Sequence, residues 1–163
     1  MRAIYCYFMS TVNTESPDGI LLVDKPAGMT SFQVVDRIKK EFKLKKVGHG
    51  GTLDPLATGL LIILINRGTK LASRFLGGDK EYLAEIRLGV QTDTQDITGK
   101  SLEKRDVGDI TPQRVAEALE NFRGEIEQIP PMFSALKHKG QPLYRFARRG
   151  GEVKRKPRKV TIS

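Results

Sequence analysis

The feature that most constrains the fold is an uninterrupted apolar run from Leu60 to Ile65, in which three of the six residues are isoleucine. β-Branched residues favour strands, and a continuous apolar run is typical of a strand covered on both faces. The run is far shorter than the ~20 residues that cross a bilayer. It therefore predicts a buried strand rather than a membrane span.

Patterns before this run predict a strand and a helix. Ile20 to Val23 is a short apolar run bounded by Gly19 and by Lys25-Pro26, which predicts a buried strand. A helix is predicted from about Ser31 to Phe42, with Thr30 or Ser31 as its cap. The expected apolar stripe of this helix consists of Phe32, Val35, Ile38 and Phe42.

The second half of the chain mixes strand and helix signals. Apolar and polar residues alternate from Glu81 to Leu88, which predicts a half-exposed strand. A capped helix is predicted from Thr111-Pro112 to Phe122, a short helix from Pro142 to Arg149, and a strand from Lys159 to Ile162. Because strands and helices do not alternate in a regular βαβ rhythm, the predicted fold class is α+β.

Length and composition indicate a soluble globular chain. The 163 residues correspond to about one domain, and 39% hydrophobic with 29% charged residues argues against disorder, collagen and coiled coil. Residues 1–18 are expected to form a flexible N-terminal extension, and either Met1 or Met9 could be the true start. Cys6 is the single cysteine, which fits a reducing cytoplasm.

The net charge of +9 is concentrated near the C-terminus. Residues 137–163 hold ten basic residues and one acid, so residues 1–136 are neutral on balance. Such a patch is expected of a phosphate-binding surface, and a solubilising basic tail is the alternative. Charge alone leaves both interpretations open.

The stretch from Gly48 to Gly59 is the most unusual one, and several site types can be excluded for it and for its neighbours. It lacks the Gly-Lys-Ser/Thr ending of a phosphate loop. Asp93, Asp96 and Gly99 have the wrong spacing for a calcium loop, and two histidines with one cysteine make no zinc site. What remains is Asp54, either an Asp that caps a turn before a proline or an acid presented closely to a ligand.

Here the residues carry a resemblance. Gly48 to Leu61 resembles the catalytic-aspartate motif of the TruB family of pseudouridine synthases, which isomerise uridine 55 in the T loop of tRNA. Three further segments agree in order and spacing, and the similarity covers roughly Gly19 to Ile162. These segments are Lys25–Ser31, Asp79–Tyr82 with Leu88-Gly89 and Thr92-Asp93-Thr94-Asp96-Gly99, and Ile129–Lys137 with Gly140 and Leu143-Tyr144.

The resemblance implies a fold and a set of site residues. The fold would be a mixed, largely antiparallel sheet with flanking helices, as in the family's catalytic domain, whose N-terminal part would be residues 19–163. Asp54 would be the nucleophile and Tyr82 the active-site tyrosine. His49 would help to hold the flipped-out nucleotide, and Lys25 and Lys137 would contact RNA phosphate or support the site. Gly51 and Thr52 complete the expected RNA-binding set. No metal or other cofactor is expected.

The match has departures, and it leaves rival functions. Gly50 stands where bacterial members usually carry a threonine, whereas Leu56 to Leu61 looks bacterial rather than guide-dependent. The family's downstream Gly-Thr-Tyr-Ile-Arg-type motif and its RNA-binding domain do not occur before Ser163, so the catalytic domain is expected to be incomplete at its C-terminus. The expected protein is a cytoplasmic monomer that binds the tRNA T loop, with no membrane and no obligate protein partner. A non-catalytic RNA-binding fragment or tRNA chaperone, and a guide-dependent ribosomal RNA synthase, remain alternatives.

Overall fold

The computed structural model describes residues 2–9, 17–134 and 136–163, with residues 2–9 described by their backbone. The chain forms two compact units, residues 1–82 and residues 83–163. The predicted catalytic domain of residues 19–163 is thus divided after Tyr82, a boundary that no composition shift in the sequence marks. Each unit is described by itself below.

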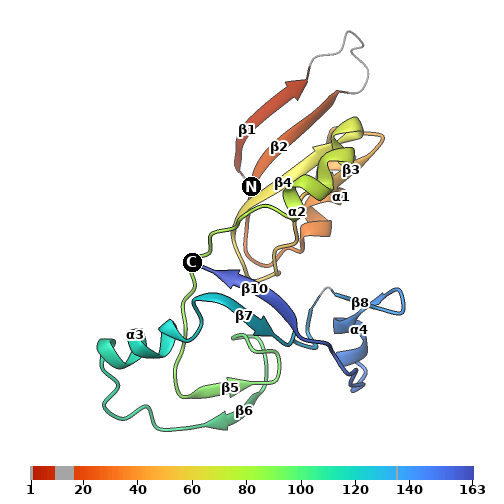
Figure 1. Cartoon of the computed structure of the whole chain (residues 1–163). Coiled ribbons are helices and arrows are strands. Elements are labelled where there is room, and N and C mark those ends of the chain that lie inside the picture. The colour runs from red at the N-terminus through yellow and green to blue at the C-terminus, as the bar shows by residue number, and fades with distance from the viewer. Residues whose placement is uncertain (1, 10–16, 135) are drawn as a thin grey trace. The chain divides into compact units, whose positions relative to one another are not determined.

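A four-stranded antiparallel sheet forms the frame of the N-terminal unit. Its strands are β1 (Arg2–Met9), β2 (Asp18–Lys25), β3 (Val47–His49) and β4 (Gly59–Ile65), in the order β1-β2-β4-β3 (Figure 1). Part of the expected flexible extension is therefore a strand, because β1 pairs with β2 from Arg2 to Met9. The aromatic and β-branched residues of this segment explain its pairing. Residues 10–16 lie outside the described part.

The apolar run that predicts a buried strand is β4, which lies between β2 and β3. Leu61, Ile63 and Ile65 face a core cluster that includes Val23 of β2, and each of the three is at most 5% exposed. Leu64 points to the other face and is also buried, whereas Leu60 is 56% exposed. The prediction of cover on both faces is thus correct for the end of the strand and wrong for its beginning.

Helix α1 (Ser31–Glu41) closes the core from one face of the sheet. Thr30 is its N-cap in a complete capping box. The backbone N–H of Gln33 donates to Thr30 Oγ1, and the backbone N–H of Thr30 donates to Gln33 Oε1. The buried face consists of Ser31, Val34, Val35 and Ile38. The predicted stripe is therefore half wrong, because Phe32 and Phe42 are 72% and 62% exposed.

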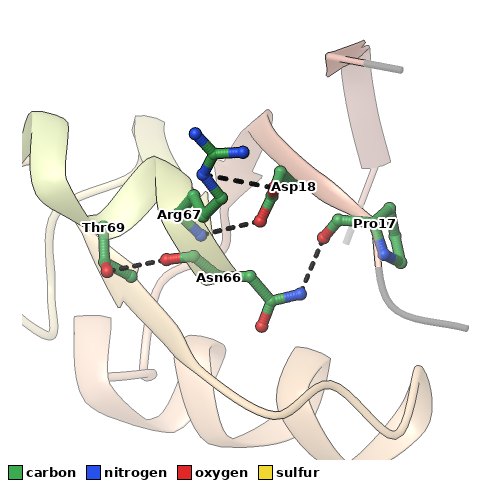
Figure 2. A network of polar contacts seen from close by, with 5 residues as sticks. All are labelled: Pro17, Asp18, Asn66, Arg67 and Thr69. Atoms are coloured by element: carbon green, nitrogen blue, oxygen red, sulfur yellow. Dashed lines mark hydrogen bonds and ion pairs between the residues drawn. The ribbon is translucent and has the colours of Figure 1, made fainter. Parts of the chain in front are cut away.

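A polar network fixes the end of β4 beside the start of β2 (Figure 2). Asn66 opens the 3-10 helix η1 (Asn66–Leu71), which continues into α2 (Ala72–Leu76). Its side-chain amide donates to the Pro17 carbonyl at 2.8 Å, and the Arg67 N–H donates to the Asp18 carboxylate at 2.8 Å. A Cβ on Gly68 would collide with the Gly19 carbonyl, so glycine permits this close approach.

The described residues of the C-terminal unit form three separate two-stranded antiparallel sheets. They pair β5 (Val90–Thr92) with β6 (Ser101–Lys104), β7 (Gly124–Gln128) with β10 (Arg158–Ile162), and β8 (Lys137–His138) with β9 (Gln141–Pro142). The predicted helices are confirmed as α3 (Pro112–Glu120) and α4 (Leu143–Ala147), and the predicted C-terminal strand is β10. The α+β class is confirmed, and every strand pair between described residues is antiparallel.

The strand predicted from Glu81 to Leu88 is absent from the structure. Residues 81–87 have no regular secondary structure, and Leu83 and Ile86 are 105% and 69% exposed. Alternation makes a strand only where another strand supplies the ladder and a core covers the apolar side, and neither is present for this segment. No helix in the described part of the chain is long and apolar enough to cross a membrane.

Candidate active site

Asp54 lies in the irregular segment that joins β3 to β4. Asp54 is exposed, and its backbone carbonyl accepts a hydrogen bond from the Ala57 N–H at 3.1 Å. This short turn keeps Asp54 at the surface of the N-terminal unit. The backbone of Asp54 therefore makes a turn, while no hydrogen bond or ion pair between described residues engages its carboxylate.

Ser31 anchors the residue that precedes Asp54. The Ser31 hydroxyl accepts a hydrogen bond from the Leu53 N–H at 2.9 Å and lies 3.1 Å from the Leu53 carbonyl, to which it donates. Ser31 is 2% exposed at the first position of α1, and the Leu53 side chain packs against the core. The first turn of α1 therefore fixes the backbone from which Asp54 projects.

Lys25 anchors the residue that follows Asp54. Its side chain is completely buried, and its ammonium donates to the carbonyls of Pro26, Met29 and Pro55 at 3.0, 2.8 and 3.3 Å. Three donors thus meet three acceptors. Burial lowers the pKa of Lys25 from its ordinary value of 10.5, and the nearby negative charge of Asp54 acts in the opposite direction.

These contacts separate the two roles expected of Lys25. An RNA phosphate needs an accessible ammonium, and this one has no exposed surface and no donor left. The structure therefore favours Lys25 as a support of the Asp54 loop over a phosphate ligand.

The segment after Lys25 also holds the loop. Gly28 has φ +83°, a conformation in which a side chain would be strained, and its N–H donates to the Pro55 carbonyl at 2.7 Å. Pro55 thus accepts from both the Gly28 backbone and the Lys25 side chain. Hydrogen bonds thus join two motifs of the sequence, Lys25–Ser31 and Gly48–Leu61.

A pocket of about 90 Å³ lies beside the Asp54 loop, within the N-terminal unit. It brings together three of the predicted site residues, namely Gly51, Thr52 and Tyr82. Tyr82 is 65% exposed, so one part of its ring lines the pocket while the rest stays accessible. Asp54 itself is not among the lining residues, although its neighbour Leu53 is.

The pocket also explains Gly50. A Cβ at this position would lie 2.7 Å from Phe75 Cβ, so the buried glycine lets α2 approach the loop. Phe75 is a lining residue as well. The departure at Gly50 is thus a packing feature, since the space of a side chain is filled by Phe75.

The other two predicted residues, His49 and Lys137, belong to different units. His49 ends β3, and its Nδ1 is buried with no hydrogen-bond partner among the described residues. Lys137 is exposed in β8 of the C-terminal unit, which leaves its ammonium accessible to a phosphate.

Sequence reasoning missed three residues of this site. The local pattern indicates Ser31 only as a helix cap, and its contact with Leu53 spans 22 positions. Phe75 and Lys80 line the pocket, and Lys80 donates to the Leu76 and Gly78 carbonyls at 3.0 and 2.6 Å. Lys80 lies in the Asp79–Tyr82 segment that carries the resemblance but is not predicted there as a site residue, and no local pattern indicates Phe75. In the described residues no group of three His, Cys, Asp or Glu side chains is placed to hold a metal ion.

Comparison with known proteins identifies the family of the chain. The family described as "TruB family pseudouridylate synthase (N terminal domain)" matches residues 39–163, which include the Asp54 loop and Tyr82. The chain belongs to the TruB family. Its similarity to curated TruB proteins extends further towards the N-terminus and takes in most of the chain.

Three curated relatives are each named tRNA pseudouridine synthase B. The protein from Desulfotalea psychrophila is 49% identical over 88% of this chain and 59% of its own length. The relative from Endomicrobium trichonymphae is 51% identical over 89% and 63%, and that from Aquifex aeolicus is 50% identical over 89% and 50%. The chain thus spans between half and two thirds of the length of these relatives.

A solved structure of a Cbf5-Nop10-Gar1 complex also aligns with this TruB chain. The alignment covers 74% of this chain and 31% of the other, with a TM-score of 0.49 and 28% sequence identity.

Proposed function

We propose that the protein isomerises uridine to pseudouridine at position 55 of the tRNA T loop, with Asp54 as nucleophile. The observation that carries the proposal is an exposed carboxylate on a loop whose two flanks are fixed, at Leu53 by Ser31 and at Pro55 by Lys25. Its support is the family membership and the name shared by relatives about 50% identical to the chain.

The proposed reaction is balanced without a redox partner. The bond between N1 of uracil and C1′ of ribose breaks, the base turns, and a bond between C5 and C1′ forms. C5 loses its proton and N1 gains one, so the product is an isomer of the substrate. A carboxylate suits this reaction because it can form a covalent adduct and later release it.

The anchored loop prepares Asp54 for this role. A nucleophile is effective when its backbone is already in place before the substrate binds, because the ordering cost is then met by folding. Ser31 and Lys25 hold the two neighbouring residues from the buried side, which leaves the Asp54 side chain directed by backbone alone. The Lys25 ammonium in addition attracts the negative charge of Asp54.

The pocket beside the loop is the proposed place of the extruded base. A stacked uridine hides C5 and C1′, so the enzyme must flip it out at a cost of a few kcal/mol. Tyr82 offers a partly exposed aromatic ring on which a base can pack, and Gly51 and Thr52 offer close backbone approach. The exposed Lys137 is proposed as a phosphate contact.

The test replaces Asp54 by asparagine and measures pseudouridine in a transcribed tRNA. We expect Asp54→Asn to abolish pseudouridine formation and to leave tRNA binding within about a factor of three. The matched control is Asp24→Asn, which removes an exposed carboxylate from β2 of the same unit and should retain activity. Activity of Asp54→Asn close to that of the wild type would remove Asp54 from the mechanism.

The same assay separates the rival functions. It contains one RNA and one protein, so turnover excludes a requirement for a guide RNA. A wild-type protein that binds tRNA and forms no pseudouridine would instead favour the non-catalytic RNA-binding alternative.

A further inference from the structure

A second basic surface lies at the end of α1, within residues 1–136, which are neutral on balance. Residues 36–46 contain six basic and two acidic residues. Both acids are engaged, since Asp36 pairs with Lys40 at 2.8 Å and Glu41 with Arg37 at 3.9 Å. The remaining four lysines, Lys39, Lys43, Lys45 and Lys46, are exposed and have no ion pair with any described residue. We call these four residues the α1 lysine cluster.

The backbone that carries the cluster is well fixed. Leu44, in the middle of the turn, is 7% exposed and belongs to the core, and its N–H donates to the Lys39 carbonyl at 3.0 Å. The Lys46 N–H donates to the Asn66 side chain at 3.0 Å, and the Asn66 N–H donates to the Lys46 carbonyl at 2.8 Å. The lysines thus project from an ordered turn rather than from a solvated tail.

Lys43 occupies a position that favours glycine. It follows the helix C-cap Phe42 with φ +50°, the left-handed conformation in which glycine costs least. The left-handed conformation belongs to the helix ending, since the Leu44 N–H donates to the Lys39 carbonyl and the Lys43 N–H to the Lys40 carbonyl. A lysine is less favourable there than a glycine, so the helix ending does not explain the lysine side chain. The helix dipole explains a cation in the last turn, such as Lys39, but not Lys45 and Lys46, which lie beyond the turn.

An exposed aromatic ring stands among these lysines. Phe42 is 62% exposed, although the helical pattern predicts it on the buried face. Aromatic rings beside lysines are the usual elements of surfaces that bind single-stranded nucleic acid, where a base stacks and the phosphates are neutralised. Phe42 therefore favours a nucleic acid over an anionic partner that offers charge alone, because a base can stack on the ring.

Position relative to Asp54 completes the argument. The N-terminal residue of α1, Ser31, holds the Asp54 loop, and Lys43 follows the helix C-cap at its other end. Eleven residues at 1.5 Å each give a separation of roughly 16 Å. An RNA that places one nucleotide at Asp54 has backbone phosphates within that distance.

We infer that the α1 lysine cluster with Phe42 is an RNA-backbone contact that holds the substrate strand next to the nucleotide at Asp54. The inference rests on the proposed function, because it assumes the tRNA substrate that is proposed there. The contact reads no sequence, so its contribution is affinity and position rather than choice of base.

The first test is a salt titration of tRNA binding. The slope of the logarithm of the association constant against the logarithm of the salt concentration is negative. The triple variant Lys43→Gln, Lys45→Gln and Lys46→Gln should reduce the magnitude of this slope by about 2 to 3, because each phosphate that is no longer neutralised reduces it by about one. In the isomerisation assay its KM should rise while kcat stays unchanged. The matched control is Lys100→Gln, Lys104→Gln and Arg114→Gln, which removes three exposed cations of the C-terminal unit and should leave the slope unchanged to within about one.

A second test uses the strain at Lys43. Lys43→Gly should raise Tm, because glycine relieves the positive φ, and should still weaken tRNA binding and reduce the salt slope by about one. Lys45→Gln removes the same charge from ordinary backbone and should lower the slope equally with no change in Tm. A gain in Tm together with a loss of affinity distinguishes a binding role from a structural one.

The outcomes separate the two proposals. If the wild type neither binds nor isomerises tRNA, the proposed function fails and the RNA inference fails with it. If the wild type does both while the cluster variants keep its slope and KM, only the RNA inference is overturned. A cluster variant that keeps the tRNA slope and loses binding to phosphatidylserine vesicles would likewise overturn it, in favour of a membrane surface.

Discussion

The two units of the chain differ sharply in how they bury apolar side chains. Nine of the ten buried hydrophobic residues of the described chain lie in the N-terminal unit, and Leu143 is the one in the C-terminal unit. Large apolar side chains of the second unit, such as Leu83, Ile97 and Ile129, are at least 60% exposed. Both units have strands and helices, so secondary structure alone does not make a core.

The difference follows from how the strands are covered. In the N-terminal unit, β4 has a strand on each side, and α1 packs its buried face on the sheet. In the C-terminal unit, each strand has a single partner, and no residue of α3 is buried. Two-stranded sheets are marginally stable in water, because the apolar face needs a third strand or a helix.

The largest expected effect breaks the core of the first unit. Ile63→Ala removes a fully buried side chain from β4 and should reduce the free energy of unfolding by about 2–5 kcal/mol. Leu102→Ala in β6 removes a side chain that is 65% exposed and should change the free energy of unfolding by less than about 0.5 kcal/mol. Denaturant titration of both variants measures this contrast. Equal losses would show that the C-terminal unit has a core that its exposed surfaces do not indicate.

The two predicted lysines provide the next contrast. Lys25→Met leaves three carbonyls of the Asp54 loop without their donor and should cost about 1–3 kcal/mol of unfolding free energy. Lys137→Met removes an exposed ammonium and should be neutral for stability, while it weakens tRNA binding. If Lys25→Met instead kept full stability and bound tRNA more weakly, Lys25 would be a phosphate ligand rather than a support of the Asp54 loop.

The lowered pKa of Lys25 adds a pH dependence to this contrast. Between its lowered folded value and 10.5 the unfolded chain binds more protons than the folded one, so stability rises with pH there. The stability advantage of the wild type over Lys25→Met should therefore grow as the pH increases towards 10.5. Denaturant titrations at a series of alkaline pH values measure this difference, and a constant difference would contradict it.

The smallest expected effect compares the two helix caps. Thr30→Ala removes the capping box of α1 and should cost about 1 kcal/mol of unfolding free energy, because α1 is part of the core. Thr111→Ala removes the cap of α3 and should reduce the protection of α3 amides against hydrogen exchange, with little change in global stability. A global loss at Thr111 as large as at Thr30 would show that α3 unfolds together with the core.

Local patterns predicted most elements of the fold. The capping residues Thr30 and Thr111, the apolar run at Leu60–Ile65 and the Pro142–Arg149 segment each depend on neighbours within a few positions, and each is confirmed. The strand predicted from Glu81 to Leu88 is wrong, because an alternating pattern specifies which side chains share a face of a strand but not which strand pairs with it. The buried face of α1 was half wrong for a similar reason, since the Ser31 contact with Leu53 chooses the face.

The sequence by itself determined the family and the identity of Asp54 as the candidate nucleophile, because motif order and spacing are properties of the chain. Tertiary structure decided what surrounds that carboxylate. It buried Lys25 beneath the loop, filled the space at Gly50 with Phe75, and exposed Phe42 among lysines. These outcomes depend on contacts between residues 20 to 30 positions apart and on competition for a limited buried volume, which no local pattern records.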